Sequence, residues 1–181
     1  MKYTHGGGYG LLEDGTSFPG LICGDITGGV GEVVFNTAMT GYQEVMTDPS
    51  YAAQIVTFTF PHIGNVGVND EDIETVNMAA SSGVRGCIVQ APITDPSNFR
   101  ASRHFDQWLK ARNIVGMCGL DTRALTALIR EKGMPNAVIA HAPDGTFDVA
   151  ALKQRAAAIP SIDGMDLVPG VTTAQTYSWD E

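Results

Sequence analysis

The chain has 181 residues, of which 44% are hydrophobic and 17% charged, a balance typical of a globular protein with one ordinary domain or two small ones. Twenty acidic and eleven basic side chains give a net charge of -9, which disfavours binding to nucleic acid or to an anionic membrane surface. No apolar run reaches the ~18–20 residues needed to cross a bilayer. We therefore expect neither nucleic acid nor a membrane among the partners.

The beginning of the chain is polar and rich in glycine. We expect residues 1–8 to form a flexible end and the domain to begin near Tyr9. This end shows no apolar stretch of the signal-peptide type. The three cysteines, Cys23, Cys87 and Cys118, form no Cys-x-x-Cys pair, which favours reduced thiols. Together these features predict a cytoplasmic protein.

Short runs rich in β-branched and aromatic residues predict five or six strands, each bounded by Gly, Pro, Asn or Asp. The run at 54–60 alternates Ile55, Thr57 and Thr59 with Val56, Phe58 and Phe60, which predicts a strand with one buried face. The predicted strands, in chain order, are 33–36, 54–60, 87–89, 114–117 and 137–140.

Helix signals are confined to the second half of the chain. Residues 102–113 carry Phe105, Trp108 and Leu109 at helical spacing, which predicts the first helix. Asp121 is a candidate N-cap for a second helix that ends at Lys132, before a glycine. A third helix is expected from Asp148 to about residue 158, because Pro160 cannot continue it.

Strands come first in the chain and then alternate with helices, which predicts a layered α/β domain over residues 9–160. We expect one mixed or antiparallel sheet and one partly parallel sheet, with about three helices. Residues 161–181 lack periodicity and contain Gly164, Pro169 and Gly170. We interpret them as an extended strap or linker.

No sequence pattern identifies a catalytic nucleophile or a metal site. The segment 116–120 resembles the Gly-x-Cys-x-Gly elbow of glutaminases, but its second glycine is out of place, so we interpret Cys118 as the buried end of a strand. A cysteine hydrolase built on Cys118 and His62 remains an alternative hypothesis. His5, His104 and His141 form no ligand spacing either, and no metal is predicted.

Two loops rich in turn residues merit comparison. Residues 28–32 read Gly-Gly-Val-Gly-Glu, and without a following Gly-Lys-Ser/Thr we interpret them as a turn into a strand instead of a phosphate cradle. The densest polar stretch, 36–51, contains Asp48-Pro49, a dipeptide that starts turns. Ser50 is therefore predicted to present its hydroxyl at a loop tip.

The stretch around Ser50, with motifs before and after it, resembles the N-terminal domain of the carbamoyl-phosphate synthase small chain. The resemblance extends from about residue 11 to 179. The motifs that carry it are EVVFNT at 32–37, MTGYQE at 39–44, TDPSY at 47–51, QIVT at 54–57, PHIGN at 61–65, SNFR at 97–100, DTRALT at 121–126, REKG at 130–133, GMDL at 164–167 and YSW at 177–179.

This resemblance implies a swivelling β/β/α architecture and a glutamine-binding role for Ser50, with no catalytic residue in these 181 residues. In the family, a second domain hydrolyses glutamine, and ammonia passes to a large chain that uses ATP and Mg to make carbamoyl phosphate for arginine and pyrimidine synthesis. The implied partners are the large chain, the C-terminal glutaminase domain reached through 161–181, and glutamine. No cofactor is expected in this chain. A standalone partner-binding module is the alternative.

Overall fold

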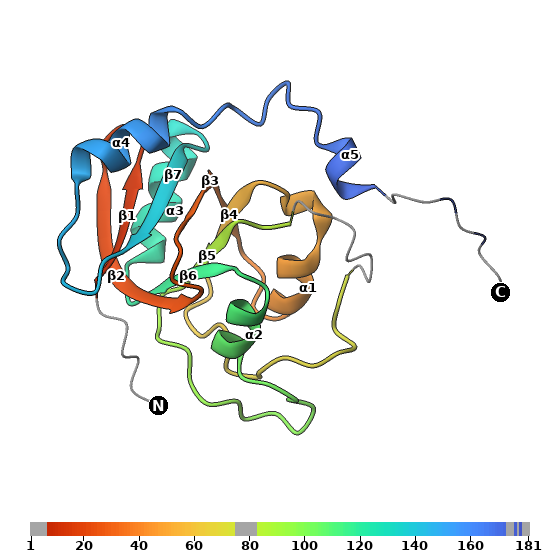
Figure 1. Cartoon of the computed structure of the whole chain (residues 1–181). Coiled ribbons are helices and arrows are strands. Elements are labelled where there is room, and N and C mark those ends of the chain that lie inside the picture. Colours follow the sequence, from red (N-terminus) through yellow and green to blue (C-terminus); the bar gives the residue numbers. More distant parts are fainter. Residues whose placement is uncertain (1–6, 75–82, 173–175, 177, 179–181) are drawn as a thin grey trace.

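The computed structural model describes residues 7–74, 83–172, 176 and 178 (Figure 1). Its seven described strands form one closed barrel in the order β1-β2-β6-β5-β4-β3-β7, and β7 pairs with β1 to close it. The strands are β1 (Gly8–Leu12), β2 (Ser17–Gly24), β3 (Gly29–Asn36), β4 (Gln54–Phe58), β5 (Gly86–Ile88), β6 (Val115–Cys118) and β7 (Asn136–His141).

Parallel and antiparallel pairings occupy different arcs of the barrel. The neighbours β3, β4, β5 and β6 are parallel to one another, whereas β1 and β7 are antiparallel to both of their neighbours. Closure leaves no unpaired sheet edge. The expected mixture of parallel and antiparallel strands is confirmed, but the expected layered pair of sheets is wrong, because β7 pairs with both β1 and β3 and thereby closes all seven described strands into one sheet.

The described residues form five α-helices and one 3₁₀ turn, where about three helices were expected. The three predicted helices are confirmed as α2, α3 and α4. The others were not predicted, and α1 contradicts the expectation that helices lie only in the second half. The elements are α1 (Tyr42–Thr47), the 3₁₀ turn η1 (Pro49–Tyr51), α2 (Phe105–Ala111), α3 (Thr122–Lys132), α4 (Val149–Ala157) and α5 (Val168–Val171).

The five predicted strands are confirmed as β3 to β7 with shifted bounds, but β1 and β2 were missed because glycines and a proline interrupt their apolar pattern. Gly10 shows why a glycine is needed there. It lies opposite Phe18, and a Cβ on Gly10 would stand 1.9 Å from the Phe18 ring. The glycine therefore lets the Phe18 ring lie across the neighbouring strand.

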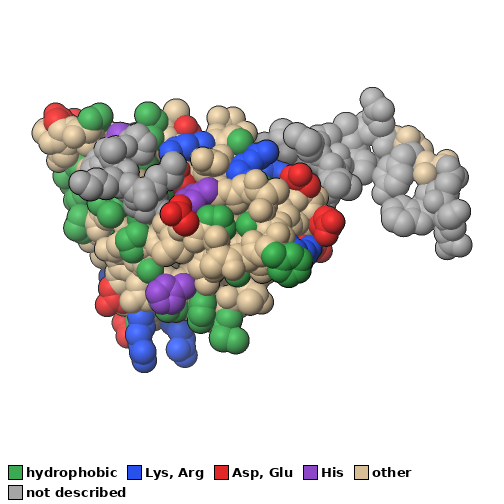
Figure 2. All heavy atoms as spheres, turned by 90° about the horizontal axis from the view of Figure 1, so that it is seen from below, with side chains coloured by type: hydrophobic (Ala, Val, Ile, Leu, Met, Phe, Trp, Pro, Cys, Tyr) green, Lys and Arg blue, Asp and Glu red, His purple; other side chains and the backbone are tan. Residues whose placement is uncertain are grey.

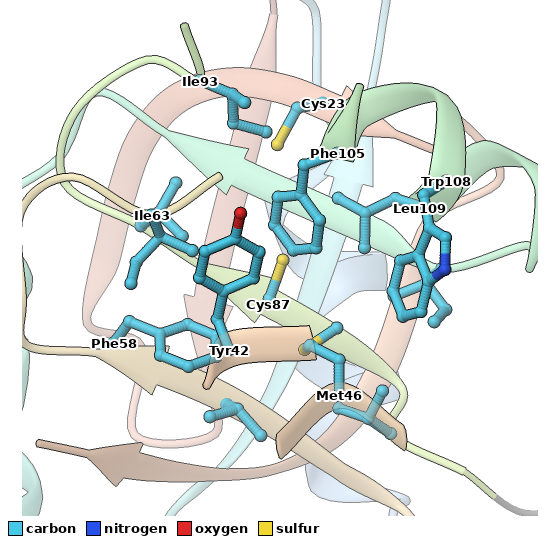
Figure 3. Packing of buried hydrophobic residues seen from close by; sticks show 14 of the residues in the cluster. Cys23, Tyr42, Met46, Phe58, Ile63, Cys87, Ile93, Phe105, Trp108 and Leu109 are labelled. Carbon is cyan, nitrogen blue, oxygen red and sulfur yellow. The ribbon is translucent and has the colours of Figure 1, made fainter. Parts of the chain in front are cut away.

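Hydrophobic side chains pack both inside and outside the barrel. The interior cluster combines inward residues of all seven strands with Leu125 and Ile129 of α3. A second group, which we call the outer cluster, fills the space between the barrel wall and helices α1 and α2 (Figure 3). On another side, Leu152 and Ala156 of α4 pack on Leu11 and Val138.

Strand β4 lies between the interior and outer clusters, so the prediction that it buries only one face is wrong. Ile55 belongs to the interior cluster, whereas Val56 and Phe58 belong to the outer one. Thr57, expected on a solvent face, is fully buried and its hydroxyl has no hydrogen-bond partner among the described residues. Helices on the outside of a barrel hide the second face of its strands, as in sheets covered on both sides.

Candidate functional site

Ser50 lies in the middle of η1, immediately after the Asp48-Pro49 dipeptide. The Asp48 carboxylate accepts a hydrogen bond from the Ser50 backbone N–H at 2.8 Å, and the Asp48 carbonyl accepts one from the Tyr51 N–H at 3.1 Å. These bonds confirm the predicted turn start. The Ser50 side chain is exposed, and within 7–74 and 83–172 no group hydrogen-bonds to its hydroxyl. That hydroxyl is available to a ligand.

The Ser50 turn is attached to the barrel on both sides. On the C-terminal side of Ser50, the Tyr51 hydroxyl accepts a hydrogen bond from Asn36 Nδ2 of β3 at 2.9 Å. On the N-terminal side of Ser50, α1 places Tyr42 and Met46 in the outer cluster. There the centres of the Tyr42 and Phe105 rings lie 4.9 Å apart (Figure 3). Buried contacts therefore fix the position from which Ser50 faces solvent.

The Tyr42 hydroxyl connects α1 to the loop that follows β4, because it donates a hydrogen bond to the Gly67 carbonyl. Burial raises the pKa of Tyr42 well above its usual value, so the group stays a neutral donor. Next to it, Gln43 and Asn69 exchange a pair of hydrogen bonds, one of them from the Asn69 N–H to Gln43 Oε1 at 3.0 Å. Helix α1 thus holds both the Ser50 turn and this loop.

A groove of about 1020 Å³ lies beside the turn, between the residues that precede and follow Ser50 and the segment after α4. Its lining includes Met46 and Pro49 on one side and Ile159 and Met165 on the other. Four arginines from different elements also line it, and none forms an ion pair with a carboxylate of the described residues. These arginines are Arg85, Arg103, Arg112 and Arg155.

With four arginines and one carboxylate, that of Glu32, in its lining, this groove is basic although the whole chain is acidic. Arg112 lies over the Trp108 ring, with the guanidinium carbon 4.6 Å from the ring centre. Burial and the neighbouring charge of Arg103 lower the pKa of Arg112, which is the expected effect of two like charges held close together. Carboxylate groups are the complementary partners of such a surface.

The glycine-rich run at 28–32 lines the same groove, and packing explains its composition. Gly28 has a left-handed φ of 83°. Cβ atoms on Gly29 and Gly31 would stand 2.8 Å and 2.5 Å from the carbonyl oxygens of Arg85 and Ala53. The predicted turn is confirmed at Gly28 only, because β3 already begins at Gly29. The glycines allow neighbouring backbone to approach β3 closely.

The three thiols lie together in the outer cluster and are fully buried (Figure 3 labels two of them). Gly116 makes room for them, since a Cβ there would stand 2.6 Å from Cys23 Sγ and 3.2 Å from Cys87 Sγ. The hydrogen bond with Cys118, together with burial, raises the pKa of Cys23, and burial raises the pKa of Cys87 to about 12. Cys118 ends β6, as predicted, and no thiol is accessible to a substrate.

The histidines do not assemble into a site. His62 is exposed and lies near Phe60, with ring centres 6.4 Å apart. His104 is buried, and its Nδ1 caps α2 by accepting a hydrogen bond from the Asp106 N–H at 3.1 Å. His141 belongs to β7, and His5 lies outside the described residues.

The described part of the chain holds neither a metal-binding cluster nor a membrane-spanning helix. No group of three or more His, Cys, Asp or Glu side chains there could hold a metal ion. No helix there is long and apolar enough to cross a membrane.

Sequence reasoning missed the groove arginines, which are scattered between positions 85 and 155 and form no pattern in the chain. It predicted that Ser50 is exposed on a turn, because Asp48 and Pro49, which start this turn, directly precede it. The fold and these features define a small α/β barrel domain with an exposed hydroxyl, a basic groove and buried thiols.

The chain belongs to the carbamoyl-phosphate synthase small chain family, because the family's CPSase-domain model matches residues 11–139. Over 171 residues it is 64% identical to the carbamoyl phosphate synthase small chain of Bradyrhizobium diazoefficiens and 62% identical to that of Mesorhizobium japonicum. The small chain of Rhizobium meliloti is 61% identical over 172 residues. Each comparison covers 94% of this chain and 43% of the relative, so the chain spans less than half of their length.

Among solved structures, an aminopeptidase from Aneurinibacillus sp. strain AM-1 superposes with a TM-score of 0.44 and 17% sequence identity. The superposition covers 75% of this chain and 30% of the aminopeptidase. This likeness is too weak to bear on fold or function.

Proposed function

We propose that the chain acts as the N-terminal part of the small chain of carbamoyl-phosphate synthase and contacts glutamine through Ser50. Family membership supports the first part of the proposal. The exposed hydroxyl of Ser50, which has no hydrogen bond to any of the described residues and is fixed on a capped turn, is the observation that carries the second part. Such a hydroxyl can donate to the carboxylate of glutamine or accept from its ammonium group.

In this role Ser50 positions the substrate and leaves bond cleavage to another domain. A hydroxyl held by a rigid turn reduces the freedom of a bound ligand, and orientation of this kind contributes to catalysis without any chemical step at the orienting residue. The burial of all three thiols supports this division, because a cysteine nucleophile must reach its substrate. We therefore propose that these 181 residues alone do not hydrolyse glutamine.

The proposed partners are the large chain of the synthase and a C-terminal glutaminase domain, the latter approached through the strap at 161–181. The large chain would use ATP and Mg, and the carbamoyl phosphate would supply arginine and pyrimidine synthesis in the cytoplasm. Within the described residues of the strap, Ile162 and Met165 line the basic groove, as does Pro49 next to Ser50, and α5 follows them. This arrangement supports an approach of the glutaminase domain from the side of the Ser50 turn.

The proposed role of Ser50 can be tested by the substitution Ser50→Ala in the complete two-chain enzyme. We expect the KM for glutamine to rise by ~10-fold, the order lost with one substrate hydrogen bond of about 1.5 kcal/mol. Synthesis from added ammonia should be unchanged, because it bypasses the glutamine site.

Ser17→Ala is the matched control, because Ser17 is an exposed serine of β2. A KM for glutamine that is the same in the Ser50 and Ser17 variants would contradict the proposed contact. Equal loss of ammonia-dependent and glutamine-dependent synthesis would instead indicate a structural role for Ser50.

A further inference from the structure

Phe99 is the most exposed large hydrophobic side chain among the described residues. It is 96% exposed, compared with 68% for Met39 and 66% for Val168. It lies in the connection between β5 and α2, which projects at the bottom of Figure 1. Single exposed hydrophobic residues are common on protein surfaces, so the surroundings of Phe99 decide whether it has a role.

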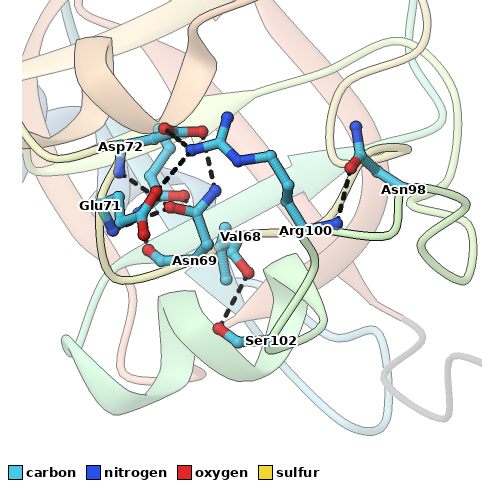
Figure 4. Close-up of polar contacts among 8 residues, drawn as sticks. Val68, Asn69, Glu71, Asp72, Asn98, Arg100 and Ser102 are labelled. Carbon is cyan, nitrogen blue, oxygen red and sulfur yellow. Dashed lines mark hydrogen bonds and ion pairs between the residues drawn. The ribbon is translucent and has the colours of Figure 1, made fainter.

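The backbone on both sides of Phe99 is held by hydrogen bonds. Asn98 Oδ1 accepts a hydrogen bond from the Arg100 N–H at 2.8 Å, and the Asn98 carbonyl accepts one from the Ala101 N–H at 3.0 Å (Figure 4). Shortly after, Ser102 donates from both its N–H and its hydroxyl to the Val68 carbonyl, at 2.9 Å and 3.1 Å. Phe99 therefore stands on a fixed turn.

Arg100 anchors the same turn through its side chain. Its guanidinium donates to Glu71 at 3.0 Å and to Asp72 at 2.8 Å, and Asp72 is in turn bonded to Asn69 (Figure 4). The two loops also approach closely at Gly67, where a Cβ would stand 2.7 Å from Ala101 Cβ and 2.8 Å from Pro96 Cβ. These contacts hold Arg100 against the loop after β4, while the Phe99 ring stays exposed to solvent.

An aromatic ring presented on a fixed turn is suited to bind a pocket of another protein. Little conformational entropy is lost when such a residue binds, because the turn is already ordered. Aromatic side chains surrounded by polar residues are typical of the energetically dominant positions of interfaces. Two carboxylates on the two loops joined here are strongly exposed, Glu71 at 83% and Asp95 at 78% of their side chains. Figure 2, seen from this side, shows hydrophobic side chains among acidic and basic ones.

The path of the chain indicates which partner the ring faces. After α4 the chain leaves the barrel along the top of Figure 1 towards α5, whereas the 94–101 connection projects at the bottom. A domain joined through the strap is tethered on the α4 side. The side that carries Phe99 remains accessible to a separate chain.

We propose that Phe99 is an anchor for the large chain of the synthase, inserting its ring into an apolar pocket whose rim carries lysine or arginine. The inference rests on the proposed function, since it names the surface through which that partner binds. Glu71 and Asp95 are the groups that such a basic rim would complement.

The test measures the affinity between the large chain and the small chain expressed from its own complete reading frame. We expect Phe99→Ser to weaken association at least ~10-fold, the loss typical of a dominant interface residue. Arg100→Ala should weaken it by a smaller factor, because the ring is retained while its support is loosened. Met134→Ser is the matched control, since Met134 is 58% exposed on the connection between α3 and β7, and it should change affinity less than twofold.

Phe99→Ser keeps the fold intact, because the ring contributes almost no buried surface. A loss below tenfold, or an equal loss in the Phe99 and Met134 variants, would overturn the inference while leaving the proposed function in place. Self-association that depends on Phe99, seen by sedimentation without the large chain, would also overturn it in favour of a second copy. If the unmodified small chain does not bind the large chain at all, the proposed function fails, and this inference fails with it.

Discussion

The Ser50 turn and the Phe99 loop each present one side chain to solvent, but they are held in different ways. The Ser50 turn follows α1, whose Tyr42 and Met46 are part of the buried outer cluster. The Phe99 loop is held by hydrogen bonds and by the exposed ion pairs of Arg100. Ser50 should therefore keep its position as long as the barrel is folded, whereas the Phe99 loop can be loosened without unfolding the chain.

Two phenylalanines provide the largest expected contrast. Phe105→Ala removes a fully buried ring that contacts Tyr42 and Trp108, and we expect it to lower the free energy of unfolding by ~3–5 kcal/mol. Phe99→Ala removes an exposed ring, and we expect a change within ~0.5 kcal/mol. Denaturant titration of the purified variants measures both values. Similar losses in the two variants would show that the loop is part of the core.

Alanine substitutions at two glycines test whether the loop after β4 must approach the Phe99 loop closely. Gly67→Ala combines a left-handed φ of 72° with the two close contacts described above, and we expect it to cost ~2–4 kcal/mol in unfolding free energy. Gly145→Ala has a similar φ of 71° and no atom within 4 Å of the new Cβ, so it should cost only the backbone term of ~1–2 kcal/mol. Equal costs at both positions would mean that the loops separate easily.

The smallest expected effect concerns Asp72, which takes part in holding the Phe99 loop. A hydrogen bond from Asn69 is the largest single cause that lowers the pKa of Asp72 from its ordinary value of 3.8, and the hydrogen bond and charge of Arg100 lower it further. A carboxyl whose pKa is lower in the folded state stabilises the fold above its unfolded pKa, and that contribution is lost as the pH falls through the folded pKa. The contact should therefore weaken below about pH 4.

Carboxyl titration by NMR would resolve the two contributions to the pKa of Asp72. Asn69→Ala and Arg100→Ala should each raise the pKa of Asp72, because each removes a group that lowers it. A pKa of Asp72 that Arg100→Ala leaves unchanged would show that the ion pair does not support the loop.

Features encoded by neighbouring residues could be predicted from the sequence. Asp121 and Asp148 cap α3 and α4 by accepting hydrogen bonds from the N–H groups of Ala124 and Ala151, at 2.9 Å and 3.0 Å. The Asp48-Pro49 turn is local in the same sense. In each case a side chain bonds to backbone two or three residues away, so a short stretch of sequence determines the geometry.

Features that depend on distant pairing could not be predicted. The strand that contains Thr57 shows an alternating pattern, and only the helices packed outside the barrel explain why both of its faces are buried. The groove arginines likewise come together through the barrel and the segment after α4. Tertiary contacts of this kind override local preferences in strands.

The closure of the barrel by β7 constrains the order in which the chain can fold. Gly8 of β1 pairs with His141 of β7, and Gly29 of β3 pairs with Ile139 of the same strand. During synthesis, the first strand therefore has β2 as its only ladder partner until β7 has left the ribosome. Pairings so far apart in sequence make a barrel fold slowly compared with a helical bundle, and the nascent chain must keep an open edge exposed until its last strand is made.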